Sequence, residues 1–200
     1  MSPAFLAEFD AAFPWFFPLC VLLLGACIGS FLNVVIYRLP KDESIVTPGS
    51  HCGCGQPIAW HDNLPILSWL FLRGRARCCG QKFSARYPFV ELLTALLFLA
   101  CWKCFPTEPK VAACGWLFVS CLIVATFTDL DHFIIPDSCT VALGFAGVML
   151  SALVPALHGF RGSLQLVNST HAVTASVQGL LIGAGLVAWI GLTAEAILKK

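Results

Sequence analysis

Long apolar runs dominate this chain of 200 residues, and short polar stretches separate them. A helix needs about 20 mostly apolar residues to cross the roughly 30 Å hydrocarbon core of a bilayer. Five runs approach or exceed that length, at residues 14–37, 89–105, 111–128, 138–157 and 173–198. The pattern therefore predicts an all-α membrane protein with about five transmembrane helices. One long polar stretch, residues 38–88, lies between the first two runs.

The composition excludes a soluble globular protein. Hydrophobic residues make up 58% of the chain and charged residues 12%, against about 45–50% and about 25% in a typical soluble domain. So few charges cannot cover a water-exposed surface. The length suits one helical bundle, which we divide into a first span at 14–37, a loop at 38–88 and a membrane region at 89–200.

Basic residues predict the orientation of the bundle, because cytoplasmic loops carry an excess of Lys and Arg. We place loop 38–88, the acidic stretch near residue 130 and the chain end in the cytoplasm, and the amino terminus outside. The inside then holds Arg38, Lys41, Arg73, Arg75, Arg77, Lys82, Arg86, Lys199 and Lys200, and the outside Lys103, Lys110 and Arg161. The start lacks a basic n-region, so we expect no cleavable signal peptide.

Four of the 11 cysteines lie in the polar loop. Cys52 and Cys54 belong to HCGCG, and Cys78 and Cys79 to RCCG. Thiolates bind Zn²⁺ tetrahedrally, and a loop without a large core gains folding free energy from such a metal. We therefore predict a zinc site on these four residues, although usual knuckles have two residues between the cysteines. His51 in place of one thiolate and four free thiols are the alternatives.

Between the cysteine motifs the chain reads WHDNLPILSWLFLRGRAR, residues 60–77. The apolar centre of this segment, residues 64–72, is too short to span a bilayer. The flanking arginines suit anionic lipid headgroups, so we expect the segment to lie on the membrane face. Membrane lipid is thus a predicted partner. The basic cluster does not require nucleic acid, and we predict none.

Carboxylates follow the third apolar run, in FTDLDHFIIPD at residues 127–137. Ionisable residues at membrane depth are costly and usually functional. Asp129 and Asp131 face nearly opposite ways on a helix, and Pro136 ends that helix, so Asp137 is expected to cap the next one. Desolvation beside the apolar helix favours a protonated Asp129, which suits either aspartic-protease chemistry or proton and ion translocation.

Four stretches form an ordered set: GACIGSFLNVVIYRLP at 25–40, the cysteine loop through WHDNLPILSW, RYPFVELLTALLF at 86–98 and FTDLDHFIIPD. Together they resemble the type IV prepilin peptidase family, also called leader peptidase/N-methyltransferase. The resemblance implies a multi-pass enzyme of the bacterial inner membrane and of the GxGD aspartic-protease type. Such enzymes cut the basic leader from prepilins and pseudopilins of type IV pili and type II secretion. They then methylate the new amino terminus with S-adenosylmethionine.

The resemblance also implies roles for individual residues. Asp129 corresponds to the first catalytic aspartate. Glu91, in VELL, supports the methyltransferase half, although an acid favoured by the helix macrodipole is an alternative for it. Loop 38–88 becomes the methyltransferase-associated part. The loop departs from the family pattern, since His51 and Ala76 occupy the positions of the first cysteine of each knuckle.

The family's second catalytic aspartate lies in a glycine-any-glycine-aspartate motif that these 200 residues do not contain. After Asp137 the only acid is Glu195. One carboxyl cannot serve as both acid and base, so region 89–200 is an incomplete peptidase and we expect no proteolysis from this chain alone. The alternative hypothesis is a catalytically inactive membrane scaffold or partner-binding homologue. A transporter is disfavoured by the cysteine loop and by the lack of a broken midplane helix.

Overall fold

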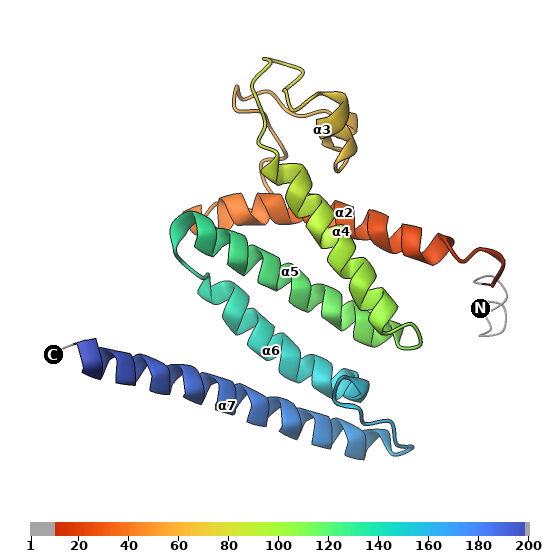
Figure 1. The fold of residues 1–200 in the computed structure, drawn as a ribbon, viewed down its shortest axis with the longest axis vertical. Helices are drawn as coiled ribbons and strands as arrows, with labels where there is room; N and C mark the ends of the chain where they lie inside the picture. Colours follow the sequence, from red (N-terminus) through yellow and green to blue (C-terminus); the bar gives the residue numbers. More distant parts are fainter. Residues whose placement is uncertain (1–10, 199–200) are drawn as a thin grey trace. The chain divides into compact units, whose positions relative to one another are not determined.

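A computed structural model describes residues 11–198. Within this range the protein consists of helices and irregular segments, with two isolated bridges and no strand. The elements are α2 (Phe16–Arg38), η1 (Leu39–Lys41), η2 (Trp60–Asn63), α3 (Leu67–Phe71), α4 (Arg86–Cys104), α5 (Pro109–His132), α6 (Asp137–Leu153), η3 (Pro155–His158) and α7 (Gln165–Leu198). The predicted all-α fold is confirmed, with the cysteine motifs in the loop between α2 and α4 (Figure 1).

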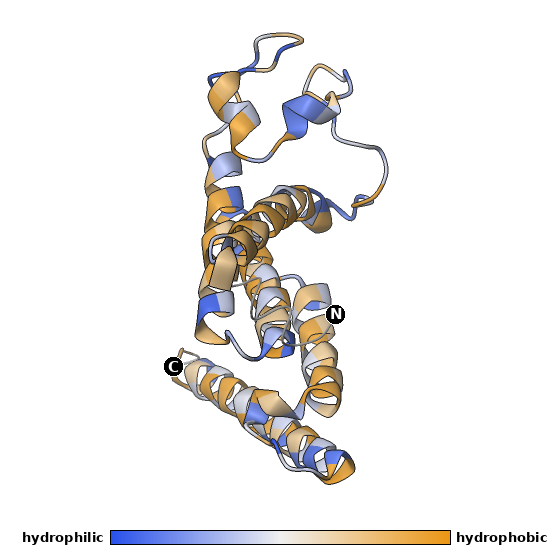
Figure 2. Ribbon diagram, turned by 90° about the vertical axis from the view of Figure 1, so that its right-hand side faces the viewer, coloured by the Kyte–Doolittle hydropathy of each residue, from blue (hydrophilic) through white to orange (hydrophobic). Residues whose placement is uncertain are grey.

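Four helices are long and apolar enough to cross a membrane, namely α2, α4, α5 and α7. Hydrophobic residues follow these helices along their length (Figure 2). The predicted span 138–157 is shorter than expected, because α6 covers only 17 residues, about 26 Å at 1.5 Å per residue. Pro155 explains its end, since proline donates no N–H and its ring clashes with the preceding turn. The chain continues there as η3 instead.

The chain divides into two compact units, Met1–Cys139 and Thr140–Lys200. The first unit contains α2, the loop, α4 and α5, together with every candidate site residue. The second contains most of α6, with η3 and α7. Within the second unit, the Ser151 hydroxyl donates to the carbonyl of Gly147 at 2.7 Å and lies 3.0 Å from Nε2 of His158.

Two glycines let α2 and α4 approach closely where they cross (Figure 1). A Cβ atom at Gly25 would lie 2.6 Å from Cα of Ala95, and one at Gly29 would lie 2.7 Å from Cα of Glu91. Carbon atoms in contact are normally about 3.5–4.0 Å apart, so neither position admits a side chain. The small residues of α2 thus allow the close contact that membrane helices use.

The second unit does not use its glycines in this way. A Cβ atom at Gly147, Gly179 or Gly183 would meet nothing within 4 Å, and one at Gly144 would make an ordinary contact with Leu180 at 3.4 Å. Among the described residues, the spacing of small residues in these helices therefore does not coincide with a close helix contact. In α7 none of the most apolar window is buried.

A small core joins α5 to α2 and α4. It consists of Leu32, Ile36, Val90, Ile123 and Val124, each at most 5% exposed. These residues place the end of α2, the start of α4 and the end of α5 side by side. The polar residues of the candidate site lie at these same helix ends.

Candidate functional site

The four loop cysteines lie together although the two motifs are distant in sequence. The Sγ atoms of Cys52, Cys54, Cys78 and Cys79 all lie within 4.8 Å of one another. Two of the distances, Cys52 to Cys79 and Cys54 to Cys78, are 3.5 Å. Tetrahedral Zn²⁺ with bonds of about 2.3 Å sets its sulfur atoms about 3.8 Å apart. The cluster therefore has the donor set and the dimensions of a four-thiolate zinc site.

Each cysteine pair lies on a tight turn that closes with a glycine. Gly55 and Gly80 follow the second cysteine of each turn and have φ angles of 85° and 69°, which glycine adopts without steric cost. Because the glycines adopt the positive φ angles, Cys78 and Cys79 do not need them. Both adjacent thiols therefore reach the same cluster without backbone strain at the cysteines. His51 does not take part, and its Nδ1 lies 3.1 Å from the carbonyl of Gly49.

The thiols influence one another's protonation. Hydrogen bonds from the backbone of Cys54 and from the side chain of Cys78 lower the pKa of Cys52 to about 7. Hydrogen bonds with the side chains of Cys52 and Cys54 raise the pKa of Cys78 to about 12. Cys52 therefore ionises near neutral pH, whereas Cys78 needs a bound cation to lose its proton.

A cavity of about 660 Å³ lies between the loop and the adjoining ends of α2 and α4. This volume falls in the range of about 300–1,000 Å³ that is typical of small-molecule and cofactor pockets. The helices contribute Ser30, Asn33, Tyr37, Arg38, Tyr87 and Glu91, and the loop contributes residues that include Cys52, Asp62, Ile66 and Trp69. Cys52 is the member of the cysteine cluster that lines this cavity together with Glu91.

Glu91 is the buried carboxylate of this cavity, and its residue is 8% exposed. Its Oε2 accepts a hydrogen bond of 2.6 Å from the backbone N–H of Ile66, and Ser30 of α2 lines the same cavity. Among residues 11–198 Glu91 has no ion-pair partner. A buried carboxylate that lines a cavity without a basic partner is available to a cationic ligand.

Ile66 has φ 61° and ψ −51°, a conformation that is rare for a β-branched residue. The hydrogen bond to Glu91 holds this strained residue, from which α3 begins. Strain of this kind persists where the surrounding structure fixes it, commonly at functional sites. Glu91 therefore fastens the loop to α4 as well as lining the cavity.

Other polar contacts of α2 hold the loop and α4. Arg38 is buried at the end of α2, and it donates to the loop carbonyls of Ser44 at 2.9 Å and Gly49 at 3.5 Å. Asn33 of α2 donates to the carbonyl of Tyr87 in α4 at 3.1 Å. Both side chains line the cavity, so the wall of the cavity is fixed by side-chain to backbone hydrogen bonds.

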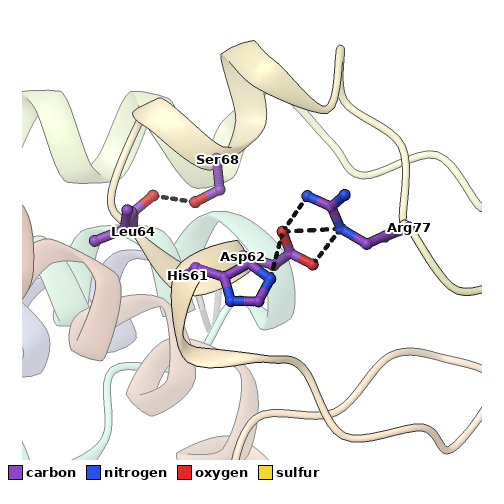
Figure 3. Close-up of polar contacts among 5 residues, drawn as sticks. All are labelled: His61, Asp62, Leu64, Ser68 and Arg77. Atoms are coloured by element: carbon purple, nitrogen blue, oxygen red, sulfur yellow. Dashed lines mark hydrogen bonds and ion pairs between the residues drawn. The ribbon is translucent and has the colours of Figure 1, made fainter.

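An ion pair links the two halves of the loop (Figure 3). Arg77 donates from Nε and Nη2 to the Asp62 carboxylate, each at 2.8 Å in its shorter contact. Arg77 holds the pKa of Asp62 below its ordinary value through these hydrogen bonds. Nearby, the Ser68 hydroxyl donates to the carbonyl of Leu64. Because Arg77 precedes Cys78, the pair positions the second cysteine turn.

Asp129 lies apart from the cavity, in the last turn of α5. The helix ends when Phe133, at φ 54°, donates its N–H to the carbonyl of Asp129 at 2.8 Å. Asp129 is exposed, which corrects the expectation that neighbouring helices desolvate it. Asp137 lies in the first turn of α6, where the sequence predicts that helix to begin.

Asp131 has a structural partner in Arg86 at the start of α4. The guanidinium donates to the Asp131 carboxylate at 2.5 Å and to the carbonyl of Phe127 at 3.2 Å. It also lies 4.9 Å from the centre of the Phe127 ring. These contacts fix the end of α5 against α4. Asp131 thus forms an ion pair with α4 while Asp129 is exposed, as expected for two residues on opposite faces of one helix.

The sequence reasoning missed Arg38, Arg86 and Asn33 as site residues. A usable signal exists for Arg86, because it shortly precedes the predicted span 89–105 and Asp131 shortly follows the next predicted span, 111–128. Two adjacent spans place these two residues on the same side of the membrane. Charges at such positions usually have a partner. The contact of Ile66 with Glu91 has no comparable signal, since it uses a backbone N–H that every residue except proline carries.

The comparisons with known proteins agree on one family. The Bacterial Peptidase A24 N-terminal domain family matches residues 23–105, which contain most of α2, the loop and all of α4. A Prepilin leader peptidase/N-methyltransferase of Myxococcus xanthus is 48% identical over 74% of this chain and 44% of its own length. Proteins of the same name from Klebsiella pneumoniae and Pectobacterium carotovorum are 36% and 37% identical. No solved structure matches the chain significantly.

Coverage differs among these relatives. The chain spans less than half of the Myxococcus relative but 91% of the Klebsiella relative and 79% of the Pectobacterium relative. The latter two alignments cover 94% and 93% of this chain, so they include both compact units. On this evidence the chain belongs to the prepilin leader peptidase/N-methyltransferase family.

Proposed function

We propose that the chain is an inner-membrane enzyme that processes type IV prepilins or pseudopilins and methylates their new amino terminus. Family membership supports this proposal, since the relatives carry both activities in their names. The excess of Lys and Arg supports an orientation with the amino terminus outside and loop 38–88 in the cytoplasm. In that orientation the cavity and Asp129 both face the side where a basic leader lies.

The cavity beneath the cysteine loop is the proposed methyltransferase site. S-adenosylmethionine, when bound, supplies a methyl group that the substrate nitrogen takes as the carbon–sulfur bond breaks. The cavity size suits such a ligand. Its mixed wall offers the Trp69 and Tyr87 rings beside polar groups such as Asn33.

Glu91 is the residue that we assign to the methyl acceptor. The acceptor is an amino terminus, which is an ammonium before it reacts. A buried carboxylate without a basic partner attracts that cation, and it accepts the proton that the nitrogen must lose. The hydrogen bond from the Ile66 N–H orients the carboxylate for this role.

Zinc on the four cysteines is the proposed device that keeps the loop over the cavity. The distances between sulfur atoms and the thiol chemistry fit Zn²⁺. The metal serves structure rather than catalysis, because four thiolates leave no open coordination position. Cys52 belongs to both the cluster and the cavity wall, so the metal site stabilises the cavity directly.

Asp129 is the proposed first carboxylate of the peptidase. Asp129 is exposed in the last turn of α5, so a second carboxylate and a water molecule can reach it. These 200 residues contain no glycine-any-glycine-aspartate motif, so we expect leader cleavage through Asp129 to need a second aspartate from outside them. A partner that supplied the second aspartate would restore cleavage.

The single observation that carries the proposal is the buried Glu91 carboxylate in the cavity beneath the cysteine loop. The test is methyl transfer from labelled S-adenosylmethionine to a peptide with the mature pilin amino terminus, so that leader cleavage is not required. We expect transfer by the wild type, a loss of at least about 100-fold in Glu91→Gln, and no change in Glu195→Gln, which removes an exposed acid from α7.

Each outcome of this assay separates the hypotheses. No transfer by a folded wild type that binds zinc supports the inactive scaffold. Methyl transfer that is unchanged in Glu91→Gln shows that Glu91 takes no part in the reaction. It favours the alternative that Glu91 is an acid stabilised by the helix macrodipole. Leader cleavage by the wild type, measured on an intact prepilin peptide, contradicts the proposed lack of proteolysis.

A further inference from the structure

Residues 64–75, which we call the finger, present an apolar surface that no other described part of the first unit covers. The finger contains α3 and the turn after it. Leu67, Leu70 and Phe71 are 50%, 58% and 83% exposed. Trp69 points the other way, and its indole N–H donates to the carbonyl of Phe83 at 3.3 Å. One side of the finger therefore packs on the rest of the loop, and its apolar side is exposed among the described residues of the first unit.

Most backbone N–H groups of the finger have hydrogen-bond partners. Within the finger, N–H groups that donate to nearby carbonyls belong to Leu67, Ser68, Leu70, Leu72, Arg73, Gly74 and Arg75. The N–H of Ile66 donates to Glu91, and the Ser68 hydroxyl donates to Leu64. Irregular backbone with unpaired groups is excluded from a bilayer interior. These hydrogen bonds lower the cost of placing the segment at the edge of the bilayer.

The contact with Glu91 sets the depth of the finger. Glu91 lies in the second turn of α4, whose first residue is Arg86. At a rise of 1.5 Å per residue, Glu91 is about 7 Å below the start of this membrane-spanning helix. Helices that lie in a membrane interface bury their apolar face by about 5–10 Å. Ile66, and α3 that begins beside it, are thus at the depth of the boundary between headgroups and acyl chains.

The charges that follow the apolar residues suit anionic lipid. Arg73 and Arg75 are exposed, and neither forms an ion pair among residues 11–198. Arg75 also lines the cavity, whereas Arg73 does not. Arginines beside an apolar segment at this depth contact lipid phosphates. A basic leader peptide would be repelled by the same charges. The occupant that fits both the apolar side and the arginines is the anionic bilayer surface.

We propose that the finger is a membrane-inserted anchor, with Leu67, Leu70 and Phe71 among the acyl chains and with Arg73 and Arg75 on anionic headgroups. Through Glu91 and Ile66 the anchor joins the bilayer surface to the cavity. The proposal concerns lipid contact and does not depend on the catalytic role of Glu91. It extends the expected position of the segment on the membrane face to a defined depth, side and set of residues.

The test uses the full chain in vesicles of phosphatidylcholine and phosphatidylglycerol in equal parts. Phe71 is replaced by 4-(trifluoromethyl)phenylalanine, and fluorine relaxation is measured with a water-soluble gadolinium chelate and with acyl-chain spin-labelled lipid. Val46, an exposed residue of the same loop outside the finger at 77% exposure, receives the same label as the matched control. At position 71 we expect several-fold weaker relaxation by gadolinium and stronger relaxation by the lipid label than at position 46.

Three results would overturn the proposal. Equal exposure to gadolinium at positions 71 and 46 places the finger in water. Protection of position 71 that begins only when a prepilin peptide is added assigns the apolar side to a protein partner. The depth of position 71 could also be the same in pure phosphatidylcholine as in the mixed vesicles, and unchanged in Arg73→Gln/Arg75→Gln. That result contradicts a role for anionic headgroups. The expected result is a shallower position 71 in that double variant and in the zwitterionic vesicles.

Discussion

The loop between α2 and α4 and the pair of helices that carries it are held together by opposite means. The two helices pack closely because Gly25 and Gly29 have no side chains, so that α2 contacts the backbone of α4. The loop contains no comparable packing and few buried apolar residues, of which Cys52 and Ala76 are the clearest. It is fixed by four clustered thiols, the Asp62–Arg77 ion pair and the hydrogen bond of Ile66 to Glu91.

The difference shows how one chain builds a site at a membrane surface. Close helix packing fixes the position of Glu91, which is the residue that Gly29 faces. Polar and thiol contacts then place the loop over that residue. Damage to the loop should leave the helices intact, whereas damage to the helix contact should disturb both regions. The following predictions test this asymmetry.

The largest effect is expected from Cys54→Ser. Loss of one of four ligands should lower zinc affinity by at least about 100-fold, since even partners of the ligands contribute about 10–100-fold. Zinc per chain by mass spectrometry and amide exchange across residues 39–85 measure the result. We expect rapid exchange in the loop and unchanged exchange in α2 and α4. Cys20→Ser is the control, because Cys20 is a free thiol of α2. Full zinc retention in Cys54→Ser contradicts the assigned ligand set.

The next effect is expected from Gly29→Leu. The new side chain would overlap the backbone of α4 at Glu91, and overpacking of this kind costs about 1–3 kcal/mol or more. Thermal unfolding in detergent measures the loss, and methyl transfer should fall with it because Glu91 moves. Gly183→Leu is the matched control, since a Cβ atom at Gly183 meets nothing within 4 Å. Equal tolerance of both substitutions would show that the α2–α4 contact is not tight.

A smaller effect is expected from Arg86→Gln. The substitution removes the ion pair with Asp131 and weakens the hold on the Phe127 carbonyl, at a cost of about 1 kcal/mol for groups that are one-third exposed. Amide exchange should accelerate in the last turn of α5 and not in the loop. Lys110→Gln, at the opposite end of α5, is the control. Faster exchange that starts in the cysteine loop would contradict the assigned contact.

The smallest expected effect is a pH-dependent contribution of Asp62 to the stability of the loop. Arg77 lowers the pKa of Asp62 in the folded state, so the ion pair stabilises the loop above the unfolded value of about 3.9. This contribution is lost as the pH falls through the lower pKa of the folded state. The stability difference between wild type and Asp62→Asn should be constant near neutral pH and vanish in strong acid. Asp42→Asn, an exposed acid of the same loop, should show no such difference. A difference that persists in acid contradicts the ion-pair origin.

The sequence alone predicts the parts of this fold that depend on local pattern. Apolar length locates α2, α4, α5 and α7. In α2, Gly25 and Gly29 lie four residues apart at the close contact with α4. Gly179 and Gly183 have the same spacing in α7, yet a Cβ atom at either position would meet nothing within 4 Å. A small-residue pattern permits close packing but does not supply the partner helix.

The remaining features depend on tertiary structure. Usual zinc-knuckle spacing disfavours the pair Cys78–Cys79, yet the turn that Gly80 closes brings both thiols to the cluster. Exposure of Asp129 follows from where α5 ends and not from the hydropathy of the helix. The Ile66–Glu91 contact joins two segments 25 residues apart through a backbone donor. No sequence pattern marks such a contact.

The most direct test of the central claim is the location of bound S-adenosylmethionine. The radiolabelled compound is photo-crosslinked to the purified full chain, and the labelled peptides are identified by mass spectrometry. The proposed site predicts label within residues 30–91, on the loop and on the adjoining ends of α2 and α4, and weaker label in Gly29→Leu, whose new side chain disturbs the wall of the cavity. Label confined to residues 140–198, or equal label in the wild type and in Gly29→Leu, would contradict the assignment of the cavity to methyl transfer.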